Sequence, residues 1–361
     1  MLNRTPLYEA HVALQGRLVD FAGWEMPIQF AGILAEVRTV RSKLGLFDVS
    51  HMGRIWLTGP DAIQILNWLT TADVPSLRVS RAKYTFICND KGGIIDDGII
   101  YRLGQEQYLL ICNASNRAKI WTVLTTARDN QFNSVELDDR TSMIGMIALQ
   151  GPLANDVMNG LAPGLAEALR PFQIRRAEIL GQSMLIARTG YTGEDGFEIM
   201  PQSTACLDVW YGLVERGATP CGLGSRDILR LEAGLLLHGS DMDETVNPFE
   251  AGMERFVFAG KESIASTSFH TVLKDGIEKK LVGFFMIDRG VPRHGFDIIK
   301  DETVVGVVTS GGYSPSLDSY IGLGYVPVEA ASPGTLMYIS VRGRLVEAQV
   351  TTLPFYTRRK S

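Results

Sequence analysis

The chain has 361 residues, of which 45% are hydrophobic and 21% are charged, an ordinary profile for a globular protein. That length suffices for about two or three domains, each with its own core. The formal net charge of −5 argues against binding to nucleic acid or to an anionic membrane surface.

The cysteines and histidines are too scattered for several common kinds of site. The 4 cysteines are widely spaced with no C-x-x-C, which argues against a zinc knuckle or a disulfide framework and fits a reducing compartment. The 5 histidines form no H-E-x-x-H, so no metal site is predicted. The sequence shows no secretory or transit peptide and no run near the ~18 apolar residues of a membrane helix. We therefore expect a cytoplasmic enzyme with no metal, no nucleic-acid partner and no membrane association.

Up to about residue 280, segments with helical periodicity alternate with segments typical of strands. In chain order, the pattern predicts a helix at 59–71, a β-hairpin at 83–103, a strand at 107–113, a helix at 115–128, a strand at 143–152, a helix at 152–162, a hairpin at 177–189 and helices at 206–217 and 225–237. This order is typical of an α+β fold, in which helices cover antiparallel sheets.

After about residue 280 the sequence pattern predicts several short strands. Turns rich in Gly, Pro or Asp separate these strands, which indicates a small all-β barrel or sandwich. The predicted strands lie within 280–287, 296–300, 302–315, 319–327 and 335–355.

Two adjacent acids, Asp96 and Asp97, interrupt the strongly apolar strand at 94–101. Successive side chains of a strand point to opposite faces, so Asp97 and Tyr101 share one face and Asp96 lies on the other. Both faces are otherwise apolar, and an unpaired buried carboxylate is costly. At least one of the two acids is therefore expected to be paired, protonated or functional.

The stretch RTGYTGEDGFEI at 188–199 is rich in glycine but matches no phosphate-binding pattern. We interpret it as a tight turn whose Gly190, Gly193 and Gly196 allow positive φ or close backbone approach. The turn also carries Tyr191 and leads to Glu198, and polar groups on a rigid turn can line a cleft.

Several blocks that occur in order resemble the T-protein family, the aminomethyltransferases of the glycine cleavage system. They extend over almost the whole chain and read RTPLYEAH (4–11), VDFAGWEMPIQF (19–30), LGLFDVSHMG (44–53), NDKGGIIDDGIIY (89–101), ALQGP (148–152), RTGYTGEDGFEI (188–199), CGLGSRDILRLEAG (221–234), NPFEAGM (247–253), GYVP (324–327) and PFY (354–356).

This resemblance implies an α+β, three-domain cloverleaf with a C-terminal β-barrel around a central folate site. The implied domains are residues 1–52 with 140–240, residues 53–139 with 241–278, and residues 279–361. The implied reaction passes the methylene of the aminomethyl group, carried on the lipoyl arm of H-protein, to the cosubstrate tetrahydrofolate. Ammonia and dihydrolipoyl H-protein are the other products. Lipoylated H-protein is then the partner, and a monomer is expected.

The resemblance also implies site residues. Asp97 matches the family's acid in the GGIIDD strand and is the predicted catalytic residue. Near a folate nitrogen, its carboxylate could position that nitrogen, assist proton movement or stabilise an iminium-like carbon. A reduced pterin needs carboxylate acceptors and aromatic walls, and the predicted folate-binding residues are Tyr84, Asp97, Tyr101, Asn113, Tyr191, Glu198, Arg226 and Tyr356.

Simpler interpretations exist for several of these residues. Asp97 could be a salt-bridged or capping acid, and a structural role is the favoured one for Asp96. Arg226 suits carboxylate recognition through its planar fork, but it could instead pair with Glu232 or another acid. The structural roles favoured for two further residues are an ion pair for Arg230 and a buried, hydrogen-bonded side chain for His51.

Three other functions are alternatives to aminomethyl transfer. A folate-dependent demethylase of a small methylated amine or sulfonium compound would share the folate pocket but need no carrier protein. A folate-binding protein of iron–sulfur assembly would carry a K-G-C-Y-x-G-Q-E stretch, which is missing here. A folate domain of a flavin oxidase would follow a dinucleotide fingerprint, which is also missing. Within the matched blocks, Gly98 stands where relatives usually carry a large aliphatic residue.

Overall fold

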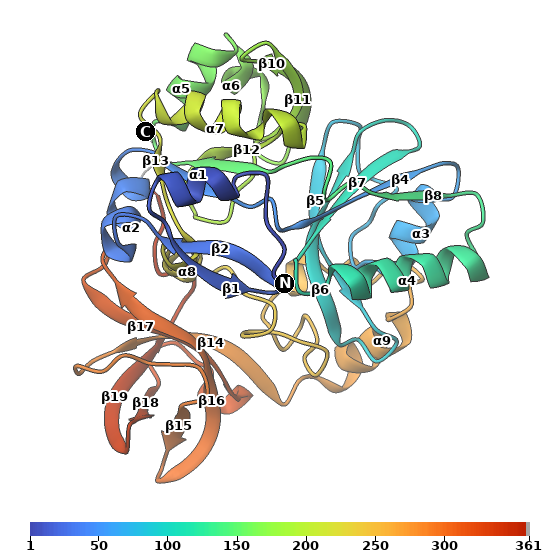
Figure 1. The fold of residues 1–361 in the computed structure, drawn as a ribbon. Coiled ribbons are helices and arrows are strands. Elements are labelled where there is room, and N and C mark those ends of the chain that lie inside the picture. Colours follow the sequence, from blue (N-terminus) through green and yellow to red (C-terminus); the bar gives the residue numbers. More distant parts are fainter. Residues whose placement is uncertain (359–361) are drawn as a thin grey trace. The chain divides into compact units, whose positions relative to one another are not determined.

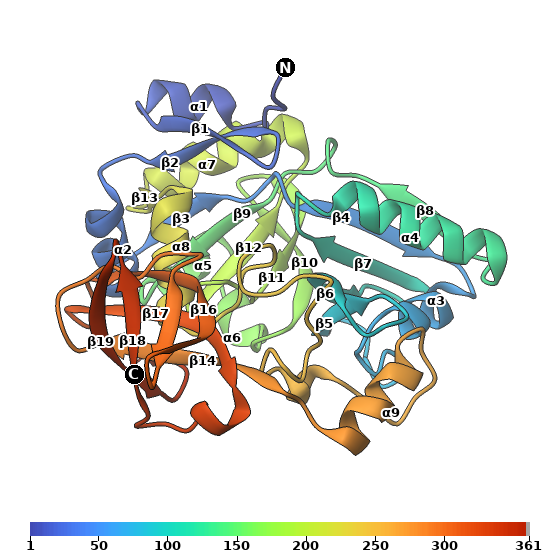
Figure 2. The ribbon, with the colours of Figure 1, turned by 90° about the horizontal axis from the view of Figure 1, so that it is seen from below.

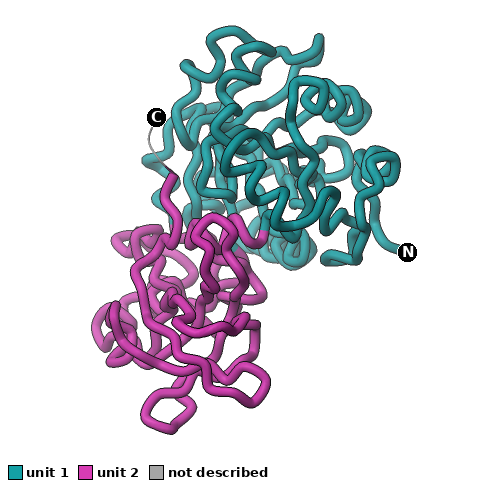
Figure 3. The backbone as a smooth tube through the Cα atoms, turned by 90° about the vertical axis from the view of Figure 1, so that its left-hand side faces the viewer, with its two compact units in different colours: residues 1–68, 72–85, 97–226 teal, residues 69–71, 86–96, 227–361 magenta. Residues whose placement is uncertain are grey.

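The structure is a computed structural model that describes residues 1–358. The chain divides into two compact units (Figure 3). The first comprises residues 1–68, 72–85 and 97–226, and the second comprises residues 69–71, 86–96 and 227–361. Each unit is described by itself.

The first unit contains a six-stranded sheet in the order β10-β11-β12-β9-β3-β13. Neighbouring strands of this sheet pair antiparallel, except that β13 pairs parallel with β3. Its strands are β3 (Gly45–Asp48), β9 (Ile147–Gln150), β10 (Ile174–Ile179), β11 (Gln182–Ala187), β12 (Gly196–Met200) and β13 (Thr219–Pro220).

Helices of the same unit pack on this sheet. Figure 1 shows α5, α6 and α7 beside β10, β11 and β12, and their side chains join those of the strands in one buried apolar cluster that includes Trp210 and Phe197. Burying such a cluster is the main driving force for folding. The elements before the first strand of this sheet are α1 (Tyr8–Ala13), the two-stranded ribbon of β1 (Arg17–Phe21) and β2 (Trp24–Gln29), and α2 (Ile33–Ser42). The helices later in the chain are α5 (Ala154–Leu161), α6 (Leu165–Ala168), the 3-10 helix η1 (Ser203–Ala205) and α7 (Cys206–Val214).

A five-stranded antiparallel sheet has the order β5-β6-β7-β4-β8. The helix α4 runs along this sheet (Figure 2) and buries Ile120 and Leu124. The predicted hairpin at 83–103, the strand at 107–113 and the helix at 115–128 are confirmed. The elements are β4 (Gly53–Thr58), α3 (Ala62–Leu69), β5 (Ala82–Cys88), β6 (Ile94–Arg102), β7 (Gln107–Cys112), α4 (Arg117–Asn130) and β8 (Glu136–Asp139).

The second unit contains a closed barrel in the order β14-β17-β16-β15-β18-β19. The sequence predicted either a barrel or a sandwich here, and the structure is a closed barrel. Phe284 and Ile339 are fully buried in its core. Its strands are β14 (Lys279–Met286), β15 (Asp297–Lys300), β16 (Thr303–Ser314), β17 (Ser319–Pro327), β18 (Leu336–Val341) and β19 (Arg344–Thr351), and the other helices of this unit are α9 (Ser266–Asp275) and the 3-10 helices η2 (Glu254–Phe256) and η3 (Val328–Ala330).

The helix α8 (Leu223–Glu232) is shorter than predicted. The sequence pattern predicts a helix to residue 237, but the chain leaves the helix at Glu232, and Gly234 has a φ of +65°. Glycine adopts this left-handed conformation without a steric penalty and commonly follows a helix end. The apolar run after Gly234 therefore does not continue the helix.

The chain is a mixed α+β protein with a closed C-terminal barrel, as predicted. The three-domain division with the boundaries given above stays a prediction. None of the helices formed by residues 1–358 is both long and apolar enough to cross a membrane.

Candidate functional site

Three neighbouring strands bring polar side chains together around Asp97. Asp97 lies on β6, where the pairing of Gly98 with Cys112 sets Asn113, just after β7, opposite it. Asn113 Nδ2 donates a hydrogen bond to Asp97 Oδ1 at 2.8 Å, and Tyr84 OH, from β5, donates to Oδ2 at 2.8 Å. Each carboxylate oxygen thus accepts at least one hydrogen bond, which fixes the orientation of the carboxylate. Asp97 itself is only half-buried.

The two adjacent acids have different environments. Asp96 is fully buried with 0% exposure, whereas Asp97 is half-buried. The alternation of a strand explains the difference, because the two side chains point to opposite faces of β6. Only Asp97 combines partial exposure with the hydrogen bonds of Tyr84 and Asn113.

A second carboxylate, Glu198 on β12, is 5% exposed and lies among hydroxyl groups. Thr189 Oγ1 donates a hydrogen bond to Glu198 Oε2, and Tyr101 OH lies 2.9 Å from Thr189 Oγ1 and donates to the same carboxylate oxygen at 3.4 Å. Burial raises the pKa of Glu198, against the lowering effects of Thr189, Arg226 and Tyr101. Thr189 was not predicted as a site residue, because its contact with Glu198 depends on how the turn between β11 and β12 folds.

Arg226 and Tyr191 extend this second group. The Cζ atom of Arg226 lies 4.9 Å from the centre of the Tyr191 ring, within the range of a cation–π contact. Burial lowers the pKa of Arg226, while the charges of Glu198 and Tyr191 raise it. Its Nη1 atom is buried and has no hydrogen-bond partner among residues 1–358. An unsatisfied buried donor is costly unless a ligand supplies an acceptor.

The glycines of the 188–199 turn have the predicted role. Gly193 has a φ of +78°, a conformation that favours glycine. A Cβ on Gly190 or on Gly196 would come within 2.0 Å and 2.4 Å, respectively, of the Gln150 side chain amide. Gln150 Nε2 donates to the carbonyl oxygen of Thr189 at 3.1 Å. The missing side chains of Gly190 and Gly196 therefore let the turn approach Gln150 closely enough for this hydrogen bond.

The remaining sequence-predicted residues lie as follows. Tyr356, in the second unit, donates its backbone N–H to the carbonyl oxygen of Glu232 at 2.7 Å, and its role in folate binding stays a prediction. Arg230 has the predicted ion pair, a buried one with Asp241. His51 is buried as predicted, but its Nδ1 has no hydrogen-bond partner among the described residues.

The first unit thus presents two kinds of recognition group. Asp97 and Glu198 can accept hydrogen bonds, Tyr84, Tyr101 and Tyr191 supply aromatic surface, and Arg226 has a spare donor. This mixture suits a flat ligand that carries N–H donors and an acceptor. Within the part of the chain that the structure describes, no cluster of three or more His, Cys, Asp or Glu side chains could hold a metal ion.

The chain is similar to known proteins over nearly its full length. A family model described as the GCVT N-terminal domain matches residues 7–261, and one described as the glycine cleavage T-protein C-terminal barrel domain matches residues 279–357. An aminomethyltransferase of Rubrobacter xylanophilus is 44% identical, over 100% of this chain and 96% of the relative. One of Symbiobacterium thermophilum is 42% identical, over 98% and 97%. The crystal structure of glycine cleavage system aminomethyltransferase T from Bartonella henselae covers 99% of both chains at 32% identity, with a TM-score of 0.93.

The chain belongs to the glycine cleavage T-protein family. Both family models lie on it in order, and the relatives extend over nearly its full length. It is a transferase, and its activity is that of an aminomethyltransferase.

Proposed function

We propose that the chain passes the methylene of an aminomethyl group, carried on the lipoyl arm of H-protein, to tetrahydrofolate, with Asp97 as the catalytic residue. The observation that carries this proposal is the Asp97 carboxylate, which is half-buried and oriented by Tyr84 and Asn113. A carboxylate oxygen can accept more than one hydrogen bond. A folate N–H is proposed to bond to this carboxylate alongside Tyr84 and Asn113.

The proposed reaction exchanges two bonds at one carbon. The methylene carbon loses its bonds to the lipoyl sulfur and to the amino nitrogen, and it gains bonds to N5 and N10 of tetrahydrofolate. The two N–H protons of these folate nitrogens are balanced by the new S–H bond of dihydrolipoyl H-protein and the added N–H bond of ammonia. The carbon passes through an electron-poor, iminium-like stage, where a fixed negative charge is stabilising.

Asp97 fits this step in two ways. Its fixed carboxylate can accept a hydrogen bond from the attacking nitrogen and so hold it in line with the carbon. The same charge stabilises the cationic carbon without reorganisation, because Tyr84 and Asn113 already define its direction. The fixed Asp97 carboxylate thus both positions the attacking nitrogen and stabilises the cationic carbon. A role in proton transfer would add to these two effects.

The second group of residues is proposed to bind the pterin. Glu198 accepts hydrogen bonds from Thr189 and Tyr101, and it is proposed to accept one from the amino group of the ring. Tyr191 is proposed as a wall of the pocket, with Arg226 Nη1 as the donor to a ligand oxygen. Tyr101 is linked by one hydrogen bond to Thr189 and lies on the same face of β6 as Asp97. The strand β6 therefore connects the residues proposed to bind the pterin with the proposed catalytic residue, Asp97.

The demethylase alternative is not favoured. Relatives that extend over nearly the full chain at about 40% identity are named aminomethyltransferases. A lipoylated H-protein as partner, a monomeric state and a cytoplasmic location stay predictions.

The test is formation of methylene-tetrahydrofolate from aminomethyl-loaded H-protein. H-protein without its lipoyl group is the matched control, and a set of free methylated amines and sulfonium compounds tests the alternative. The proposal predicts that methylene-tetrahydrofolate forms with loaded H-protein and with none of the other donors. Binding of tetrahydrofolate without turnover of loaded H-protein, together with turnover of a free methylated compound, would overturn it.

A further inference from the structure

The turn at 188–195 joins β11 to β12 and carries side chains of the proposed pterin site. Thr189 and Tyr191 lie on it, and Glu198 follows it by three residues. Turns are more mobile than the strands they connect, so a turn that presents binding groups needs support of its own. Arg188, the first residue of the turn, has no part in the function proposed above.

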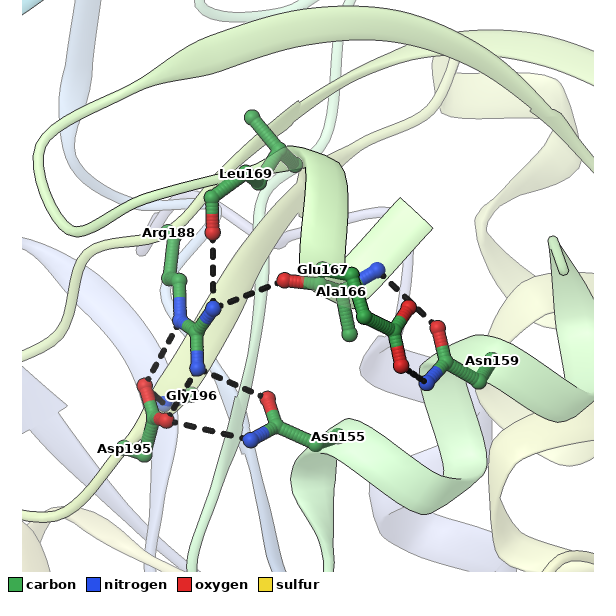
Figure 4. A network of polar contacts seen from close by, with 8 residues as sticks. All are labelled: Asn155, Asn159, Ala166, Glu167, Leu169, Arg188, Asp195 and Gly196. Atoms are coloured by element: carbon green, nitrogen blue, oxygen red, sulfur yellow. Dashed lines mark hydrogen bonds and ion pairs between the residues drawn. The ribbon is translucent and has the colours of Figure 1, made fainter. Parts of the chain in front are cut away.

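Arg188 uses every N–H of its guanidinium (Figure 4). Nε donates to Asp195 Oδ1 at 3.0 Å, and Nη2 donates to Asp195 Oδ2 and, at 3.1 Å, to Asn155 Oδ1. Nη1 donates to the carbonyl oxygens of Ala166 and Leu169, both at 2.7 Å. A guanidinium has five N–H groups, and all are occupied. A lysine ammonium cannot reproduce this planar, bidentate pattern.

These bonds fix the two ends of the turn. Arg188 is its first residue and Asp195 its last, so their bidentate ion pair sets the distance between the ends. Asp195 Oδ1 also accepts the backbone N–H of Gly196 at 3.0 Å, and Oδ2 accepts Asn155 Nδ2 at 3.3 Å. The side chains of Arg188 and Asp195 are only 15% and 21% exposed. Such shielding makes the pair stronger than one in open solvent.

We propose that Arg188 is a positioning residue for tetrahydrofolate binding, acting by holding Thr189 and Tyr191 against Glu198 and Arg226. This proposal rests on the proposed function. Thr189 is joined directly to Arg188 in the chain, and its hydroxyl donates to Glu198. Tyr191, two residues further on, stacks against the guanidinium of Arg226. Movement at the base of the turn would therefore disturb both contacts.

The same network provides an internal control. Asn159 Nδ2 donates to Glu167 Oε1 at 2.7 Å, and Asn159 Oδ1 accepts the backbone N–H of Ala166 at 3.0 Å (Figure 4). Among the described residues, these bonds connect α5 with α6 and involve no residue of the turn. Asn159→Ala therefore loosens the neighbouring helices without removing any contact of Arg188.

The experiment compares Arg188→Lys, Asp195→Asn and Asn159→Ala with the wild type. Calorimetry gives the Kd for tetrahydrofolate, steady-state kinetics give kcat and the KM values for both substrates, and thermal unfolding gives Tm. Arg188→Lys keeps the positive charge but loses the bidentate fork, and Asp195→Asn breaks the pair from its other side. If one of these two variants does not fold, the other one carries the test.

We expect Arg188→Lys and Asp195→Asn to raise the Kd and KM for tetrahydrofolate about tenfold, which corresponds to about 1.4 kcal/mol. The KM for loaded H-protein should stay within about twofold of the wild-type value, and Asn159→Ala should lower Tm with tetrahydrofolate affinity unchanged. Equal effects of all three variants on affinity, or a lower Tm with unchanged affinity in Arg188→Lys, would overturn the proposal. A wild type that binds tetrahydrofolate but ignores loaded H-protein refutes the proposed function instead, and calorimetry still tests Arg188.

Discussion

Acid should destabilise the fold through the protonation of His51. This side chain is 3% exposed, and burial, together with the charges of Arg226 and Arg54, lowers its pKa from 6.5 to about 4, although Asp48 opposes the shift. Between these two pH values the unfolded chain binds a proton that the folded chain does not. Unfolding is therefore favoured increasingly as the pH falls from 6.5 to 4.

The size of the effect follows from the shift. One pKa unit corresponds to 1.36 kcal/mol, so a shift from 6.5 to about 4 makes the free energy of unfolding at pH 4 about 3 kcal/mol smaller than at pH 7. Glu198 contributes with the opposite sign, because a raised carboxyl pKa stabilises the fold at low pH and that stabilisation is lost as the pH rises through the folded-state pKa. The effect of His51 is therefore isolated by comparing the free energy of unfolding of the wild type with that of a variant that lacks His51.

The assay is urea unfolding, followed by tryptophan fluorescence, of the wild type and His51→Gln between pH 7.5 and pH 4. Glutamine does not titrate in this range. The stability of the variant relative to the wild type should improve by about 3 kcal/mol over this interval. A difference between the two proteins that stays constant with pH would contradict this prediction, because the His51 pKa would then be the same in the folded and unfolded chains.

Three further substitutions test the site. Tyr84→Phe removes one of the donors to Asp97, a hydrogen bond to a charged group worth about 1.5–3 kcal/mol, so kcat for methylene transfer should fall at least about tenfold; an unchanged kcat would contradict the orienting role. Gly98→Ala places a Cβ 2.3 Å from the carbonyl oxygen of Ile111, so thermal unfolding should show a stability loss of about 1–3 kcal/mol. An unchanged Tm would show that the sheet accommodates the Cβ without strain. Glu198→Gln should weaken tetrahydrofolate binding in calorimetry more than it lowers kcat, and the reverse order would count against its role as a binding group.

Local patterns predicted most of the secondary structure because strands and helices follow from short-range periodicity. The hairpin at 83–103 carries its own turn signal, and the barrel strands after residue 280 are separated by clear breakers. The helix α8 was predicted too long because apolar spacing continues past Glu232, and only the positive φ at Gly234 marks the end.

The site was less predictable because its contacts join distant strands. Tyr84 and Asn113 were predicted as folate-binding residues, but their hydrogen bonds to Asp97 depend on how β5, β6 and β7 lie in the sheet. Thr189 meets Tyr101 across 88 positions of the sequence, and no local pattern indicates that pairing. Asp97 itself could be proposed as a site residue, since two acids in an apolar strand already conflict with burial.

The most direct test of the account is Asp97→Asn, assayed for methylene-tetrahydrofolate formation from aminomethyl-loaded H-protein alongside the wild type. Tetrahydrofolate binding is measured separately by calorimetry. Asparagine keeps the shape of the side chain but removes its charge, so we expect binding within about threefold of wild type and a rate at least about 100-fold lower. A variant that retains most of the wild-type rate would contradict the catalytic role of Asp97, and so would one that loses rate only in proportion to its loss of binding.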